Sequence, residues 1–197
     1  SQLLGITLTK RSDYFMAGIP YHAAEQYIGK ALQAGKKVAI CDQVETPQPG
    51  KLVKRSLTRI LTPGTTIEDN QIESSRNHYL AAFELEKSGA SLCWLDLSTG
   101  EFQIATGKSV DDLMPVLTSI DPAEMLVMEG EENRWRAMAH DGSTHDELTH
   151  FLATRSVTEL PGYHFDIDAG VQSVMDTLGV INLEGFGIDK DHPALGC

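Results

Sequence analysis

The carboxylates around Asp96 are the residues whose types could support metal-ion catalysis. Asp96 lies in a predicted strand, and Glu124, Asp166 and Asp168 could join it to hold two Mg²⁺ ions for phosphodiester cleavage. Asp96 also comes two residues before Ser98-Thr99-Gly100, where an aspartate often stabilises a turn. We predict the structural role, and we keep a metal-dependent nuclease of the ribonuclease-H-like class as the alternative function.

The triplet Gly107-Lys108-Ser109 is a second candidate, because it follows a predicted strand and begins a predicted helix. A phosphate-binding loop needs a glycine five residues before Gly107, and that position is Phe102. Without this glycine the backbone amides cannot surround a phosphate. We therefore predict only that Ser109 caps the helix.

Asp146 and His150 are spaced so that one helix face could carry two metal ligands. A zinc site needs further ligands, and His140 and His145 do not share that face. We predict a solvated acidic helix here. No nucleophile can be paired with a base from the sequence, so it predicts no catalytic residue and no metal site.

The charge of the chain is divided unevenly along its length. Residues 1–66 hold nine Lys and Arg and four acidic residues, a net charge of +5. The whole chain carries −12, so residues 67–197 carry −17. This division predicts two modules, of which only the first can face a polyanion. The sign changes near residues 61–66, which read Leu-Thr-Pro-Gly-Thr-Thr.

The basic module is better suited to binding than to catalysis. Lys10 and Arg11 end one predicted strand, Arg55 and Arg59 lie on another, and residues 14–16 (Tyr-Phe-Met) are predicted to form a loop. Basic groups neutralise phosphates, and an apolar loop can wedge against base steps in the minor groove. On charge and composition alone, a solvated basic face with an inward-packing loop is an equally good interpretation.

Composition narrows the class of protein. Three widely separated cysteines, Cys41, Cys93 and Cys197, argue against a secreted disulfide framework and favour a reducing cytosol. No apolar run is long enough to span a membrane, and the first residues do not form a signal peptide. The chain begins without Met and stops without a helix cap, so we expect it to be truncated at both ends.

The first module is predicted to be a small mixed-sheet α/β domain. Residues 6–11 alternate as a strand, residues 24–32 repeat at helical spacing, and Gly35 follows as a left-handed cap. Residues 38–41 form an apolar run typical of a buried strand. Residues 52–61 have strand composition with basic side chains left in solvent.

The second module is predicted to be a ribonuclease-H-like domain. Three strands joined by short turns, at 79–85, 91–97 and 101–105, predict an antiparallel meander. They are followed by a helix near 109–120, a strand at 125–128, two helical pieces near 131–139 and 146–153, a strand at 156–160 and a helix near 166–178. This order is that of a mixed sheet with helices on its faces.

Several segments together resemble the MutS family of bacterial DNA mismatch repair proteins. They are Leu8–Arg11, Met16–Ala23 (Met-Ala-Gly-Ile-Pro-Tyr-His-Ala), Val38–Glu45, Val53–Arg55, Leu61–Thr65, Leu95–Phe102, Pro122–Glu124 and Leu183–Gly187. These segments cover most of the chain in the family's order. The resemblance implies a part of a homodimeric, ATP-driven clamp that kinks mismatched duplexes and recruits a MutL-type matchmaker, in the cytoplasm at the nucleoid.

The resemblance also implies domain boundaries and cofactors. Residues 1–66 would be most of the mismatch-recognition domain, 67–77 a linker, 78–187 a connector without nuclease activity, and 188–197 the start of the lever region. ATP and Mg²⁺ would belong to the family's ATPase domain, so this chain is expected to need no cofactor and to be no enzyme.

The resemblance carries over a short set of DNA-binding positions. They are Lys10, Arg11, Met16, Arg55 and His22. The family's stacking aromatic belongs to a Phe-Xaa-Glu motif expected just before Ser1, and Phe15 does not replace it because Ala17 stands where the Glu would be. Residues 12–15 are also fewer than the family has before its Met-Ala-Gly, and they lack the expected Pro.

Overall fold

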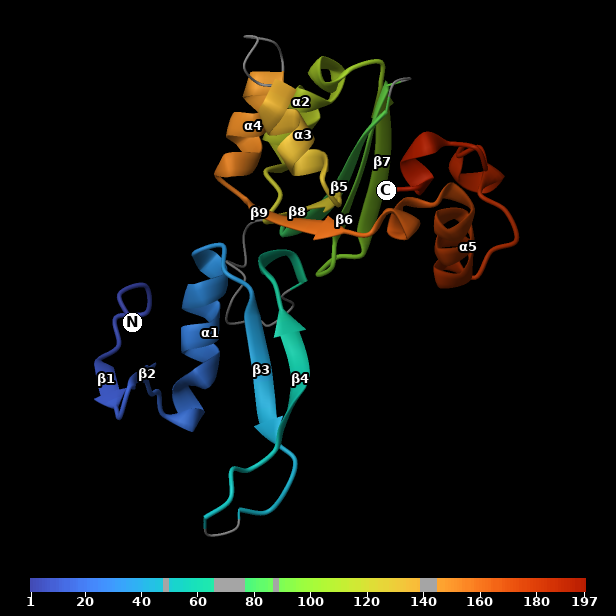
Figure 1. Cartoon of the computed structure of the whole chain (residues 1–197). Coiled ribbons are helices and arrows are strands. Elements are labelled where there is room, and N and C mark those ends of the chain that lie inside the picture. The colour runs from blue at the N-terminus through green and yellow to red at the C-terminus, as the bar shows by residue number, and fades with distance from the viewer. Residues whose placement is uncertain (48–49, 66–76, 87–88, 139–144) are drawn as a thin grey trace. The chain divides into compact units, whose positions relative to one another are not determined.

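The computed structural model of the chain describes residues 1–47, 50–65, 77–86, 89–138 and 145–197 (Figure 1). The residues divide into two compact units, Ser1–Arg76 and Asn77–Cys197. The α/β class predicted from the sequence is confirmed. Among the described residues, no helix has the length and apolar character that crossing a membrane requires.

The first unit contains two separate antiparallel strand pairs and one α-helix. Strand β1 (Leu8–Arg11) pairs with β2 (Tyr14–Ala17), and β3 (Val38–Gln43) pairs with β4 (Arg55–Leu61). In the described residues these pairs do not join into the mixed sheet that the sequence predicts. The short helices η1 (Tyr21–Ala23) and η2 (Pro63–Thr65) precede α1 and follow β4, respectively.

Helix α1 (Ala24–Gln33) ends as its sequence predicts. The amide of Gly35 donates to the carbonyl of Leu32, and the amide of Lys36 donates to that of Ala31. Gly35 has a φ of +70°, the left-handed conformation that this motif requires at the position after the cap. The buried side chains of this helix, Ala31 and Leu32, lie on its last turns.

Two expectations for the first unit are wrong. Residues 14–16 were expected in a loop, but they belong to β2, because the two-residue turn at Ser12 and Asp13 lets the chain pair directly with β1. Residues 38–41 were expected to be a buried strand, but β3 is exposed or half-buried along its length. Its ladder joins it to β4 alone among the described strands, which leaves its faces largely open.

The second unit is built on a five-stranded mixed sheet with the order β7-β6-β5-β8-β9. The strands are β5 (Tyr79–Glu86), β6 (Gly89–Asp96), β7 (Glu101–Gly107), β8 (Glu124–Met128) and β9 (Ser156–Leu160). The first three form the predicted antiparallel meander, and β8 and β9 add in parallel to β5. This is the predicted ribonuclease-H-like order.

Helices cover both faces of this sheet (Figure 1). One face packs against α2 (Val110–Ile120), α3 (Glu131–Met138) and α4 (His145–Ala153), through a core that includes Phe83, Leu92 and Trp135. On the other face, Ala82 and Cys93 pack against Phe165 in η4 (Gly162–Phe165), beside α5 (Ile167–Leu178). The short helix η5 (Glu184–Phe186) follows α5.

The last residues of the chain pack against this second face. The short helix η6 (Pro193–Leu195) contacts α5, β6 and β7, and Ala194 and Leu195 are buried. Cys197 lies against the cluster around Cys93. Burial raises the pKa of the Cys93 thiol to about 11 and also raises that of Cys197, so both groups are neutral thiols in an apolar contact.

Asp96 holds the turn between β6 and β7. Its Oδ1 accepts hydrogen bonds from the Ser98 amide at 2.8 Å and the Ser98 hydroxyl at 2.6 Å. The side chain is fully buried, and burial alone would raise its pKa. Hydrogen bonds from Ser98 and from the backbone of Thr99 and His78 outweigh this effect and hold the pKa of Asp96 below its ordinary value.

The first prediction concerns this carboxylate. Asp96→Asn should destabilise the second unit by about 1–3 kcal/mol at neutral pH, because the charged acceptor of these hydrogen bonds is lost. Since the folded pKa is lowered, the difference from wild type should be complete above pH ~4 and should vanish as the pH falls through the folded pKa. Urea unfolding followed by the fluorescence of Trp94 and Trp135, both buried in this unit, measures it. A loss of stability in Asp96→Asn that does not change with pH would show that the charge of Asp96 does not stabilise the turn.

The second prediction concerns Gly170 in α5. A Cβ there would lie 1.6 Å from the Leu195 carbonyl oxygen, so Gly170→Ala should separate η6 from α5 and cost about 1–3 kcal/mol. Gly185→Ala is the matched control, because a Cβ at Gly185 meets no atom within 4 Å. Thermal unfolding of the two variants should therefore differ by several degrees, and equal melting temperatures would show that the close approach is unimportant.

Candidate nucleic-acid interface

The β1–β2 hairpin carries three of the predicted DNA-binding residues. Lys10 pairs across the hairpin with Phe15, Arg11 pairs with Tyr14, and Thr9 pairs with Met16. All residues of both strands are exposed. The hairpin therefore presents Lys10, Arg11 and Met16 to solvent, and the inward-packing loop considered from the sequence is not formed.

Arg55 lies at the start of β4, opposite Gln43 on β3. Its side chain is exposed, as are Leu57 and Ile60 on the same strand. The Thr58 hydroxyl donates to the Asp42 carboxylate at 2.8 Å and also lies within hydrogen-bonding distance of the Ile40 carbonyl, beside the irregular register between Ile40 and Cys41. β4 thus leaves its basic side chains in solvent, as the sequence predicts.

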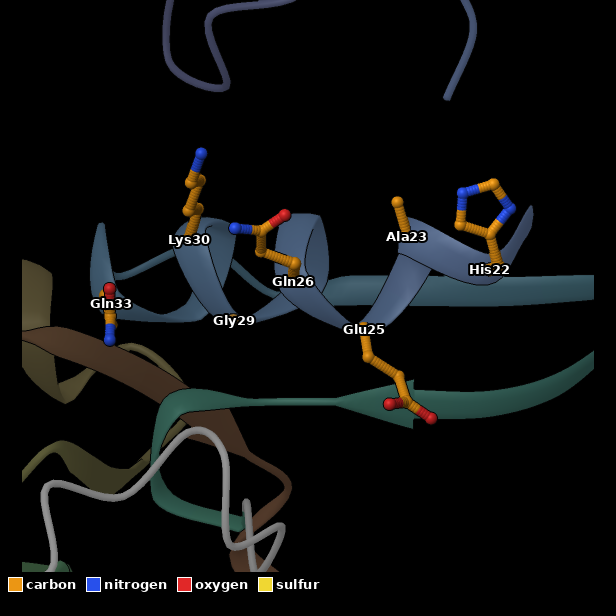
Figure 2. Close-up of a pocket in the computed structure, with 7 residues that line it drawn as sticks. All are labelled: His22, Ala23, Glu25, Gln26, Gly29, Lys30 and Gln33. Carbon is orange, nitrogen blue, oxygen red and sulfur yellow. The ribbon is translucent and has the colours of Figure 1, made fainter. Parts of the chain in front are cut away.

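His22 lies in η1, at one end of an open hollow along α1 (Figure 2). Figure 2 shows His22, Gln26 and Lys30 projecting from one side of this segment, with Glu25 directed to the other. The Lys30 ammonium lies 5.3 Å from the centre of the Tyr27 ring. A polar hollow of this kind offers donors to an anion, but it contains no nucleophile paired with a base.

The five predicted DNA-binding residues fall into three groups. Lys10, Arg11 and Met16 share the hairpin, Arg55 belongs to the other strand pair, and His22 precedes the helix. Figure 1 shows α1 between the two strand pairs. The structure therefore brings only the hairpin residues together. Sequence analysis placed Tyr14 and Phe15 in an apolar loop and left them out of the DNA-binding positions carried over from the family, although their position directly after a two-residue turn is the signal of a hairpin.

The carboxylates considered for metal binding are separated in the second unit. Glu124 is buried and accepts a hydrogen bond from the Thr158 hydroxyl, whereas Asp166 caps α5 by accepting from the Ala169 amide at 2.8 Å. Within the described ranges, no three His, Cys, Asp or Glu side chains are grouped so that they could hold a metal ion. The arrangement gives the nuclease alternative no support.

The amides that might have bound phosphate at the start of α2 already have an acceptor. Asp112 accepts from the Lys108 amide at 2.8 Å and from the Ser109 amide at 3.3 Å, and with Ser109, the predicted cap, it forms a capping box. Of the histidine–aspartate pair on α4, His150 is exposed, whereas the side chain of Asp146 and all of His140 lie outside the described residues.

Comparison with known proteins identifies both units. A family model described as MutS domain I matches residues 1–70, and one described as MutS domain II matches residues 78–197. The chain is 34% identical to the DNA mismatch repair protein MutS of Treponema denticola, with 98% of this chain and 22% of that protein covered. It is 35% identical to that of Parabacteroides distasonis, with 100% and 22% covered, and 39% identical to that of Symbiobacterium thermophilum, with 88% and 19% covered.

These relatives are much longer than the chain. The chain spans about a fifth of their length, and the matched part corresponds to two consecutive domains in their order along the chain. The model of MutS domain II alone covers more than half of the residues, so the chain belongs to the MutS family.

Proposed function

We propose that this chain acts in DNA mismatch repair, with the first unit contributing contacts to double-stranded DNA and the second acting as a non-catalytic connector. The match to MutS domains I and II in order is the observation that carries the proposal. The division of charge supports it, because residues 1–66 carry +5 and residues 67–197 carry −17. Only the first unit can approach a phosphate backbone without electrostatic repulsion.

The DNA contacts would come from the exposed residues of the first unit. Lys10, Arg11 and Arg55 are suited to phosphates, because their charged groups are exposed on strands that bury little of their own surface. Met16 offers an apolar contact to the minor groove, and His22 a further polar one. Since these residues lie on separate elements, we expect them to contact several phosphates along the duplex.

The chain itself would need neither a cofactor nor a metal for this role. In the family, ATP and Mg²⁺ would serve an ATPase domain beyond the two domains matched here, and homodimerisation would be a property of the longer protein. The protein would work in the cytoplasm at the nucleoid. No Phe-Xaa-Glu occurs within the 197 residues, so we expect this chain to bind mismatched and matched duplexes with similar affinity.

The connector would meet a MutL-type matchmaker protein. Residues 77–197 hold six Lys and Arg against 21 Asp and Glu, and this net charge of −15 disfavours DNA, whereas exposed apolar side chains such as Tyr163 and Phe186 could contribute to a protein interface. Ile181, in the segment after α5, is 91% exposed and lies between Tyr163 and Phe186 in the sequence. Binding to the matchmaker should therefore be independent of the DNA-facing residues.

The third prediction tests the DNA contacts. The chain should bind a labelled duplex weakly, with a log–log salt slope of about −4, because about four basic groups neutralise phosphates. Arg11→Ala and Arg55→Ala should each weaken binding to all sequences equally and reduce the slope by about 1. Fluorescence anisotropy across a salt series, with a matched and a mismatched duplex, measures both effects.

Lys190→Ala in the second unit is the matched control, because Lys190 is exposed but should lie away from the duplex. Its salt slope should equal that of wild type. A slope unchanged by Arg11→Ala and Arg55→Ala, or a tight mismatch-selective complex, would contradict the proposed mode of binding.

The fourth prediction tests the connector. Binding of a purified MutL-type protein, measured by surface plasmon resonance, should survive Arg11→Ala and Arg55→Ala and should weaken several-fold in Ile181→Asp, which places a charge on an apolar surface. Ser173→Asp is the control, because it adds the same charge at an exposed polar position of α5. Loss of binding in the arginine variants would place the partner on the first unit instead.

A further inference from the structure

The β1–β2 hairpin has one cation and one aromatic ring on each of its two faces. Residues paired directly across an antiparallel ladder share a face, and neighbours along a strand alternate. Lys10 therefore shares a face with Phe15, and Arg11 shares the opposite face with Tyr14. The Lys10 ammonium lies 5.9 Å from the centre of the Phe15 ring.

Both rings are unusually open to solvent for their size. Tyr14 is 78% exposed and Phe15 is 70% exposed. They directly follow the turn at Ser12 and Asp13, so the rings are next to the tip of the hairpin. Ser12 adopts a φ of +55° in this turn. Large aromatic side chains are usually buried, and exposed ones beside cations typically mark a binding surface.

The combination of rings and cations fits a nucleic-acid strand whose bases are unpaired. An aromatic ring stacks on the face of a base regardless of its identity, while a neighbouring Lys or Arg neutralises the phosphate. In a paired duplex the base faces are covered by their neighbours, so a ring could not reach them without unstacking the helix. A single strand offers base faces and phosphates together.

The geometry also argues against an apolar protein surface as the partner. Such a surface would have to cover two opposite faces of the hairpin and would bury Lys10 and Arg11 without an acidic partner, which costs several kcal/mol per charge. A flexible strand can pass around the tip and satisfy both faces. Asp13, at the tip itself, opposes the phosphates and moderates the affinity.

We propose that the tip of this hairpin binds single-stranded DNA, with Tyr14 and Phe15 stacking on bases and Arg11 and Lys10 pairing with the adjacent phosphates. This proposal depends on the proposed function in one respect, which is the choice of DNA as the nucleic acid. It differs from the duplex contacts above in requiring unpaired bases. It would direct the first unit to gaps and overhangs.

The first test compares two DNA ligands with the same number of phosphates, a blunt duplex and a duplex with a single-stranded overhang. Tyr14→Leu and Phe15→Leu remove a ring and keep an apolar side chain, so each should weaken overhang binding about five-fold or more and leave blunt-duplex binding unchanged. Tyr14→Phe keeps the ring and should restore wild-type affinity. Asp13→Asn should tighten binding to both ligands.

A second measurement does not depend on these variants keeping full affinity. The native Trp94 and Trp135 are buried in the second unit, so a tryptophan placed at the hairpin reports separately. Phe15→Trp fluorescence should be quenched on adding oligo(dT), because a base stacks on the indole. Tyr163→Trp is the control, since Tyr163 is 72% exposed in the second unit against 70% for Phe15, and its fluorescence should not change.

The outcomes separate this site from the proposed function. Selective loss on the overhang, together with quenching of Phe15→Trp alone, supports the single-strand site. Equal losses on both ligands, or no loss in the leucine variants while Arg11→Ala and Arg55→Ala still weaken duplex binding, would overturn the site and leave the proposed function standing. A wild-type chain that binds neither ligand would overturn both.

Discussion

Burial of one face of the five-stranded sheet under α2, α3 and α4 is the interaction on which the rest of the chain's order depends. Phe83 is fully buried and meets Trp135 edge to face, with ring centres 5.5 Å apart and planes at 78°. Each such side chain contributes about 1.5–3 kcal/mol when removed from water, so this cluster provides most of the hydrophobic stabilisation. Among the described residues of the first unit, the buried apolar side chains are Ala31, Leu32 and Pro63. The second unit therefore supplies most of the buried apolar contacts, and the first unit supplies the exposed basic and aromatic side chains.

Four acidic residues of the second unit are used to stabilise its secondary structure. Asp96 holds a turn, Asp112 caps α2, Asp166 caps α5, and Glu124 bonds to Thr158. Each carboxylate thus accepts from a backbone or hydroxyl donor near the end of a strand or helix, and of the two oxygens of Asp96 only Oδ1 does so. Two-metal catalysis needs carboxylates with free oxygens converging on one point. Within the described residues these carboxylates are not grouped in that way.

Local patterns predicted the second unit well because its elements are fixed by short-range rules. The turn signals in the sequence at residues 88–89 and 98–100 predicted the meander, and Ser109 predicted the start of α2 correctly. The same rules failed for residues 38–41, since an apolar run shows that a strand forms but cannot show whether another layer covers it. Of the candidate site, the exposure of Lys10, Arg11 and Arg55 was predictable from charge. Their distribution over separate elements depends on long-range pairing, which spacing alone does not encode.

The chemistry of the hairpin depends on the length of its turn more than on any one side chain. The sequence Lys10-Arg11-Ser12-Asp13-Tyr14-Phe15 places two cations and two rings symmetrically about two turn residues. Antiparallel pairing then necessarily sets each cation opposite a ring. An extra residue before Tyr14, with the two-residue turn kept, would shift the register by one, so that Arg11 would pair with the inserted residue and Lys10 with Tyr14. The short segment before Met16 therefore determines the surface of the hairpin. It lets the two strands pair directly, and each face of the hairpin then carries one cation and one aromatic ring.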